Sequence, residues 1–136
     1  MLLVLLLLLL GFLTFGAAGS DVSGSSSARE GPTSLTVAVW PRGKNGPVSR
    51  WTLTCGPRPG GTHPNPRPAC RALLENPSAL APLPPTTACT EIYGGPQMAE
   101  LRGVVDGRTV RLSYDRADGC GIDRWNALHP VFHIRI

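Results

Sequence analysis

The chain has 136 residues, of which 42% are hydrophobic and 16% are charged, and its formal net charge at pH 7 is +4. The basic residues are almost all arginines, and they are scattered rather than interleaved with aromatic residues, so a nucleic-acid-binding surface is not expected. Without its apolar beginning the chain keeps about 116 residues, enough for one small domain.

Residues 1–20, MLLVLLLLLLGFLTFGAAGS, are uncharged and apolar and end in small residues. They predict a secretory signal peptide, because the apolar run is shorter than the roughly 20 residues of a membrane span and no basic stop-transfer cluster follows. The mature protein is therefore expected to be secreted and extracellular, with no membrane association after cleavage. Residues 21–33 are rich in Ser and Gly and predict a disordered N-terminal tail, followed by a domain over residues 34–136.

Apolar alternation predicts β-strands over residues 34–40, 48–55, 97–105, 108–114 and 130–136. The pair Asp106-Gly107 predicts a tight hairpin between the third and fourth strands. Residues 70–76 and 122–128 predict two short helices, whereas the Pro- and Gly-rich segment 56–70 excludes helix and interior strand. Because hairpins take the place of βαβ units, we expect an α+β fold, a five-stranded antiparallel β-sheet with two short helices on one face.

Four cysteines lie in the predicted domain: Cys55, Cys70, Cys89 and Cys120. In an exported chain an even number of cysteines favours two disulfides, and three pairings are open. Zinc is the competing interpretation, with His63, His129 and His133 as further ligands. Because no Cys-x-x-Cys pair occurs and Pro130 interrupts any helix aligning His129 with His133, we expect no metal and no other cofactor.

The sequence lacks the short motifs of common enzyme classes, such as a nucleophile elbow, a Walker loop or a dinucleotide fingerprint. Together with the small core, this predicts that the protein is not an enzyme and has no catalytic residues. His63 is expected to be a structural loop residue that hydrogen-bonds main chain. Trp40, Trp51 and Trp125 are candidates for the core.

The segment TACTEIYGGP, residues 87–96, places a charge and two large side chains between a cysteine and a run of turn formers. A protease inhibitor presents such a loop to an enzyme cleft as an added strand, where main-chain hydrogen bonds supply affinity and one side chain fills the specificity pocket. A neighbouring disulfide favours binding, because the loop is then ordered before the partners meet.

The segment TLTCGPRPGGTHPNPRPAC, residues 52–70, resembles the first disulfide region of the Streptomyces subtilisin inhibitor family. Further matching positions cover nearly the whole mature chain: Cys89-x-x-x-Tyr93, Val104-Val105-Asp106-Gly107, Ser113-Tyr114, Cys120, Asn126-Ala127 and Val131-Phe132. The resemblance implies a five-stranded sheet with two helices, a homodimer, and the disulfides Cys55–Cys70 and Cys89–Cys120. The first predicted strand has apolar residues on both of its faces, such as Val37 on one and Trp40 on the other. This also suggests a dimer through the sheet face away from the helices.

The resemblance further implies a reactive peptide bond, Glu91–Ile92. The other predicted residues of the reactive loop are Ala88, Cys89, Thr90 and Tyr93. The chain departs from the family at Thr90 and Glu91, where proline and an apolar or basic residue are common. It also has Gly94-Gly95-Pro96 where the family has Asp-Pro.

The predicted function is a secreted, reversible inhibitor of serine endopeptidases, directed at a glutamate-specific or a subtilisin-like enzyme. Because burying the Glu91 carboxylate in an apolar pocket is costly, we expect inhibition of subtilisin about a thousandfold weaker than that by an apolar variant. The alternative is a non-inhibitory secreted binding module, or a substrate of an extracellular cross-linking enzyme that uses Gln97 and Lys44.

Overall fold

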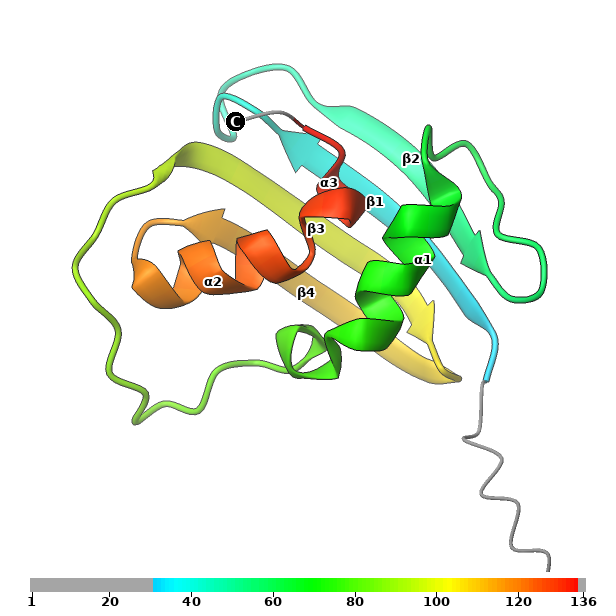
Figure 1. The fold of residues 1–136 in the computed structure, drawn as a ribbon. Helices are drawn as coiled ribbons and strands as arrows, with labels where there is room; N and C mark the ends of the chain where they lie inside the picture. The colour runs from blue at the N-terminus through cyan, green and yellow to red at the C-terminus, as the bar shows by residue number, and fades with distance from the viewer. Residues whose placement is uncertain (1–30, 135–136) are drawn as a thin grey trace, which may run out of the picture.

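The computed structural model describes residues 31–134, and these contain a four-stranded antiparallel sheet of order β2-β1-β3-β4 (Figure 1). Its strands are β1 Thr33–Trp40, β2 Ser49–Cys55, β3 Gly95–Val105 and β4 Arg108–Arg116. The first four predicted strands are thus confirmed, with ends that differ by one or two residues. Asp106 and Gly107 form the hairpin turn with φ of 48° and 74°, the left-handed geometry that the Asp-Gly pair predicted.

The predicted signal peptide over residues 1–20 lies outside the described residues, as does most of the predicted disordered tail. The tail boundary is wrong at its end, because Thr33 is already in β1. Its hydroxyl oxygen accepts a hydrogen bond from the Asp106 main-chain N–H at 3.1 Å, and Thr33 is buried. This contact joins the start of the domain to the β3–β4 turn.

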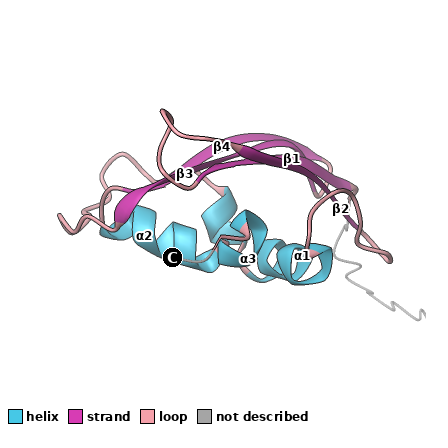
Figure 2. Ribbon diagram, turned by 90° about the horizontal axis from the view of Figure 1, so that it is seen from above, coloured by secondary structure: helices cyan, strands magenta, loops and turns pink. Residues whose placement is uncertain are grey.

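Helices cover one face of the sheet, as predicted, and no helix of residues 31–134 lies on the other, bare face, over which only a loop rises (Figure 2). They are α1 Pro66–Glu75, the 3-10 helix η1 Pro77–Leu80, α2 Gly119–Ala127 and α3 His129–Phe132. Helix α1 begins inside the segment that was predicted to exclude helix. Pro66 and Pro68 are tolerated there because the first N–H groups of a helix have no intrahelical acceptor.

The predicted fifth strand over residues 130–136 is not found; Pro130–Phe132 belongs to α3, and residues 135–136 lie outside the described part. Val131 and Phe132 are both fully buried, although neighbouring residues of a strand point to opposite faces. Leu128, Val131 and Phe132 instead stand at the i, i+3, i+4 spacing of one helix face. Pro130 fits in the first helical turn.

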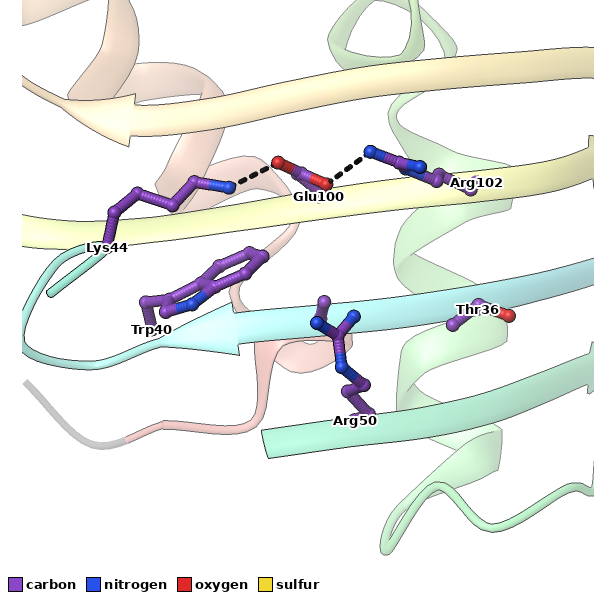
Figure 3. A pocket seen from close by; sticks show the side chains of 7 residues that line it. Thr36, Trp40, Lys44, Arg50, Glu100 and Arg102 are labelled. Carbon is purple, nitrogen blue, oxygen red and sulfur yellow. Dashed lines mark hydrogen bonds and ion pairs between the residues drawn. The ribbon is translucent and has the colours of Figure 1, made fainter. Parts of the chain in front are cut away.

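The core lies between the sheet and the helices, and β1 contributes Leu35, Val37 and Val39 to it. Trp125 is fully buried there, and Trp51 packs against its edge. Trp40 is buried, with 8% of its surface exposed, but it lies on the bare face of the sheet beneath Lys44 and outside the main core cluster (Figure 3).

His63 has the structural role that was predicted for it. Its Nε2 lies 2.9 Å from the carbonyl oxygen of Val131, and its Nδ1 accepts from the Asn65 main-chain N–H at 3.0 Å. The side chain therefore ties the loop before α1 to α3. Within residues 31–134, none of the helices has the length and apolar character needed to cross a bilayer.

Candidate functional site

The predicted site residues lie together in the loop of residues 81–94, which connects η1 to β3. This loop runs along the end of the molecule where α2 begins (Figure 1). Glu91 is exposed, and the side chains next to it are large and apolar yet reach solvent, with exposed fractions of 59% for Ile92 and 70% for Tyr93. Thr90 is exposed as well, so four consecutive residues, Thr90 to Tyr93, are available to another molecule.

Two disulfides are present, with the pairing that the resemblance implied. Cys55–Cys70 joins the end of β2 to α1, with 5.6 Å between the Cα atoms. Cys89–Cys120 joins the loop to the first turn of α2, with 5.3 Å between the Cα atoms. The second bridge therefore fixes the chain two residues before Glu91.

Thr90 continues the attachment of the loop to α2. Its carbonyl oxygen accepts hydrogen bonds from the Gly119 N–H and from the Ile92 N–H, both at 2.9 Å. The second bond closes a γ-turn centred on Glu91. The glycine at position 119 leaves room for this close approach, because a Cβ atom there would lie 2.0 Å from the Thr90 hydroxyl oxygen.

The start of α2 is itself fixed by an N-cap. The Asp118 carboxylate accepts from the Gly121 N–H at 2.8 Å, which satisfies one of the free donors of the first turn. Asp118 also stands within 4.8 Å of the sulfur atoms of Cys89 and Cys120. Since those sulfurs are bonded to each other, the group serves as a structural joint and not as a set of thiolate ligands.

Gly94 holds the downstream end of the exposed segment. Its N–H donates to the Arg116 carbonyl oxygen at 2.7 Å, and its own carbonyl oxygen accepts from Arg116 Nη1 at 2.5 Å. A Cβ atom on Gly94 would lie 2.7 Å from Ile122 Cγ1, so the loop packs directly on α2. The glycine pair at this point is thus attached to the body of the protein through Gly94.

The upstream part of the loop is held through Ala79 and Ala81. The Tyr114 hydroxyl donates to the Ala79 carbonyl oxygen at 2.8 Å, and burial raises the pKa of Tyr114 to about 12, which keeps this donor protonated. Arg124 Nη2 donates to the carbonyl oxygens of Ala79 at 3.3 Å and Ala81 at 3.1 Å. The Arg124 guanidinium also lies 4.7 Å from the centroid of the Tyr114 ring.

The sequence interpretation missed Arg116 and Arg124, which it treated as dispersed positive charge. An isolated arginine carries no spacing pattern, so its partners become visible only once the fold brings the loop beside it. A usable signal is their position close to Cys120 in the sequence: Arg116 ends β4, the strand before Cys120, and Arg124 lies on α2, the helix that contains Cys120.

Comparisons with known proteins agree with this geometry. The family model described as subtilisin inhibitor-like matches residues 32–117. The chain belongs to the subtilisin inhibitor-like family. Its members are protease inhibitors and not enzymes.

Two relatives show the extent of the similarity. Subtilisin inhibitor-like protein 5 of Streptomyces fradiae is 37% identical over 101 residues, which cover 72% of this chain and 92% of that protein. A transglutaminase-activating metalloprotease inhibitor of Streptomyces mobaraensis is 34% identical over 90 residues, which cover 63% of this chain and 60% of that protein.

A solved structure is also similar. Sermetstatin of Streptomyces caespitosus, crystallised in complex with Bacillus licheniformis subtilisin, aligns with a TM-score of 0.50 and 28% identity, over 76% of this chain and 100% of the sermetstatin chain. The subtilisin inhibitor-like domain of this chain therefore carries an exposed tripeptide between two anchored ends, on the fold of known protease inhibitors.

Proposed function

We propose that the chain is a secreted, reversible inhibitor of serine endopeptidases whose reactive bond is Glu91–Ile92. The observation that carries the proposal is the placement of three exposed residues, Glu91 to Tyr93, between the anchored residues Thr90 and Gly94. An enzyme cleft can bind such a segment as an added strand without first ordering it. Membership of the subtilisin inhibitor-like family supports the same role.

Reversibility follows from the attachments on either side of the bond. If a protease cuts Glu91–Ile92, the Cys89–Cys120 disulfide keeps the two pieces in one molecule. Thr90 remains bonded to Gly119, and Gly94 remains bonded to Arg116. The new carboxyl and amino ends therefore stay near each other, which favours resealing of the bond over release of the enzyme.

The target is proposed from Glu91, the residue on the carboxyl-donating side of the bond. An apolar specificity pocket would have to desolvate this carboxylate without a partner, whereas a pocket with a cation or several donors replaces the lost water by charge-assisted hydrogen bonds. We therefore propose a glutamate-specific serine endopeptidase as the target. A subtilisin-like enzyme is the weaker candidate, although the related sermetstatin forms a complex with subtilisin.

Titration of both enzymes with three proteins tests this assignment: wild type, Glu91→Gln and Glu91→Leu. Wild type is expected to inhibit the glutamate-specific enzyme and to inhibit subtilisin about a thousandfold more weakly than Glu91→Leu does. Glu91→Gln keeps the shape and removes the charge, so it should lose inhibition of the glutamate-specific enzyme. Equal inhibition of both enzymes by wild type and Glu91→Leu would show that Glu91 does not set specificity.

Secretion is proposed from the apolar residues 1–20, and two disulfides are in keeping with an oxidising compartment. N-terminal sequencing of the protein from culture medium should give a start close to Asp21. Retention of residues 1–20 in a cell-associated product would contradict the signal-peptide assignment.

A homodimer through the bare face of the sheet is proposed as the native assembly. The side of β1 that faces away from the helices carries Ala38 and, at the end of the strand, Trp40. Glu100 accepts hydrogen bonds from both Lys44 and Arg102, so its negative charge partly offsets the positive charge of this face (Figure 3). Light scattering at micromolar concentration should give twice the monomer mass. The exposed substitution Thr36→Arg should reduce that to the monomer mass, and a monomeric wild type would contradict the proposal.

The cross-linking alternative is disfavoured by the surroundings of its two groups. The Gln97 side-chain oxygen accepts a hydrogen bond from Arg116 at 3.3 Å. The Lys44 amine is paired with Glu100 and lies 3.6 Å from the centroid of the Trp40 ring. Gln97 is only partly exposed, whereas the Lys44 side chain is 43% exposed, so Gln97 is the less accessible of the two groups. The protease titration also decides the remaining alternative, since a non-inhibitory binding module would inhibit neither enzyme.

A further inference from the structure

Arg116 holds the downstream end of the exposed segment through its contacts with Gly94. It is the last residue of β4 and is partly buried, and it touches Gly94 through both main chain and side chain, at 2.7 Å and 2.5 Å. Its Nη1 also donates to Gln97 Oε1 at 3.3 Å. One guanidinium thus spans the irregular start of β3, where the register with β4 shifts between Gly95 and Met98.

The two sides of the reactive bond are held by different means. Upstream, Glu91 follows Cys89, which is covalently fixed to Cys120. Downstream, Ile92 and Tyr93 are exposed. The Ile92 N–H bonds only to Thr90, on the other side of the reactive bond, so the first attachment to the body of the protein is the pair of hydrogen bonds at Gly94. After cleavage, the position of the new amino group of Ile92 therefore depends on Gly94, and through it on Arg116.

The position of the Ile92 amine matters because it decides whether the peptide bond is reformed after cleavage. When the serine Oγ of the protease attacks the Glu91 carbonyl carbon, an ester forms, the C–N bond to Ile92 breaks, and the serine proton ends on the Ile92 amine. The ester then has two fates. The amine can attack the carbonyl carbon and expel the serine oxygen, which restores the peptide bond and returns the proton, or water can attack and leave a free carboxylate on Glu91.

We infer that Arg116 is a positioning residue for resealing the Glu91–Ile92 bond, an inference that rests on the proposed inhibitory function. In the intact protein the loop is covalently continuous, so Gly94 stays near β4 even without the guanidinium. In the cleaved protein the segment from Ile92 to Gly94 is a chain end, and without Arg116 it frays. Loss of the side chain therefore favours the cleaved form over the intact form.

The test compares Arg116→Met and Arg116→Lys with two matched controls. Arg124→Met removes a guanidinium that also donates to loop carbonyls, but upstream of Cys89. Arg111→Met removes an exposed arginine from the same strand as Arg116. Each protein is incubated with a catalytic amount of a glutamate-specific serine endopeptidase, at a temperature where circular dichroism shows it folded. The ratio of cleaved to intact inhibitor at equilibrium is then read by mass spectrometry after reduction.

Arg116→Met should raise the cleaved-to-intact ratio about tenfold, in keeping with loss of a charge-assisted hydrogen bond. Arg116→Lys should give an intermediate ratio, because lysine keeps a charged donor. Both controls should keep the wild-type ratio, even though Arg124→Met lowers the melting temperature. The inference is overturned if Arg116→Met keeps the wild-type ratio, or if Arg124→Met raises it equally.

The same experiment separates this inference from the proposed function. A wild type that inhibits and is cut reversibly at Glu91–Ile92, with Arg116→Met behaving identically, overturns the role of Arg116 alone. A wild type that neither inhibits nor is cut at this bond overturns both.

Discussion

Removing the disulfides one at a time should separate stability from inhibition. In the chain-entropy model, the stabilisation by a disulfide grows with the length of the loop that it closes. Cys89–Cys120 closes a separation of 31 residues and should contribute about 3.7 kcal/mol at 25 °C. Cys55–Cys70 closes a separation of 15 residues and should contribute about 3.0 kcal/mol. The two losses of folding free energy are thus similar.

Their effects on inhibition should differ sharply, because only one bridge touches the reactive loop. The double variant Cys89→Ser/Cys120→Ser releases the chain two residues before Glu91, so the protease should cut it quickly and recover full activity. Cys55→Ser/Cys70→Ser loosens the join between β2 and α1, far from Glu91, and should inhibit like wild type wherever it remains folded.

The assay measures urea unfolding and protease titration on the same preparations. Both double variants are expected to lose about 3–4 kcal/mol of unfolding free energy, with inhibition lost only for the pair at Cys89. Mild reduction of wild type should likewise abolish inhibition before the sheet unfolds. Loss of inhibition to the same extent in both variants would refute the role assigned to Cys89–Cys120, as would full inhibition by the variant that lacks it.

Three further outcomes follow from single side chains. Burial lowers the pKa of His63, so the free energy of unfolding should fall as the pH drops below about 6.5, because the unfolded chain then takes up a proton that the folded chain resists. Melting curves of His63→Gln should show a weaker fall with pH than those of wild type. An identical fall would contradict the role of His63. Tyr114→Phe removes one of two donors to the Ala79 carbonyl oxygen and should lower the free energy of unfolding by about 1 kcal/mol, or the melting temperature by about 4–8 °C. An unchanged melting temperature would mean that the hydrogen bond from Tyr114 to Ala79 is not formed in solution. Gly119→Ala places a methyl group against the Thr90 hydroxyl and should weaken inhibition while changing the melting temperature little, so unchanged inhibition would argue against the contact between α2 and the loop.

The sequence predicted those features that local patterns determine. Alternation located β1 to β4 within one or two residues of their observed ends, and Asp106-Gly107 determined the hairpin because both residues accept a positive φ. The errors arose where a pattern had two interpretations. The apolar spacing after Leu128 fits a helix face as well as a strand, and packing against the core selected the helix.

The candidate site, like the fold, could be predicted from the sequence only in part. The loop around Glu91 was found from a family resemblance and from its unusual composition, and the structure confirms that this segment is exposed. Its supports were not predictable, because Arg116 and Arg124 act across elements that are distant in sequence. The packing of Gly94 on Ile122 and of Gly119 on Thr90 likewise depends on where α2 lies relative to the loop.

The most direct test of the central claim is the mass of the inhibitor after incubation with a glutamate-specific serine endopeptidase that it has inhibited. The account predicts one cleaved species that is heavier than the intact protein by one water molecule, held together by Cys89–Cys120, and separated by reduction into pieces that end at Glu91 and begin at Ile92. Cleavage at another bond, or progressive degradation with full protease activity, would contradict it.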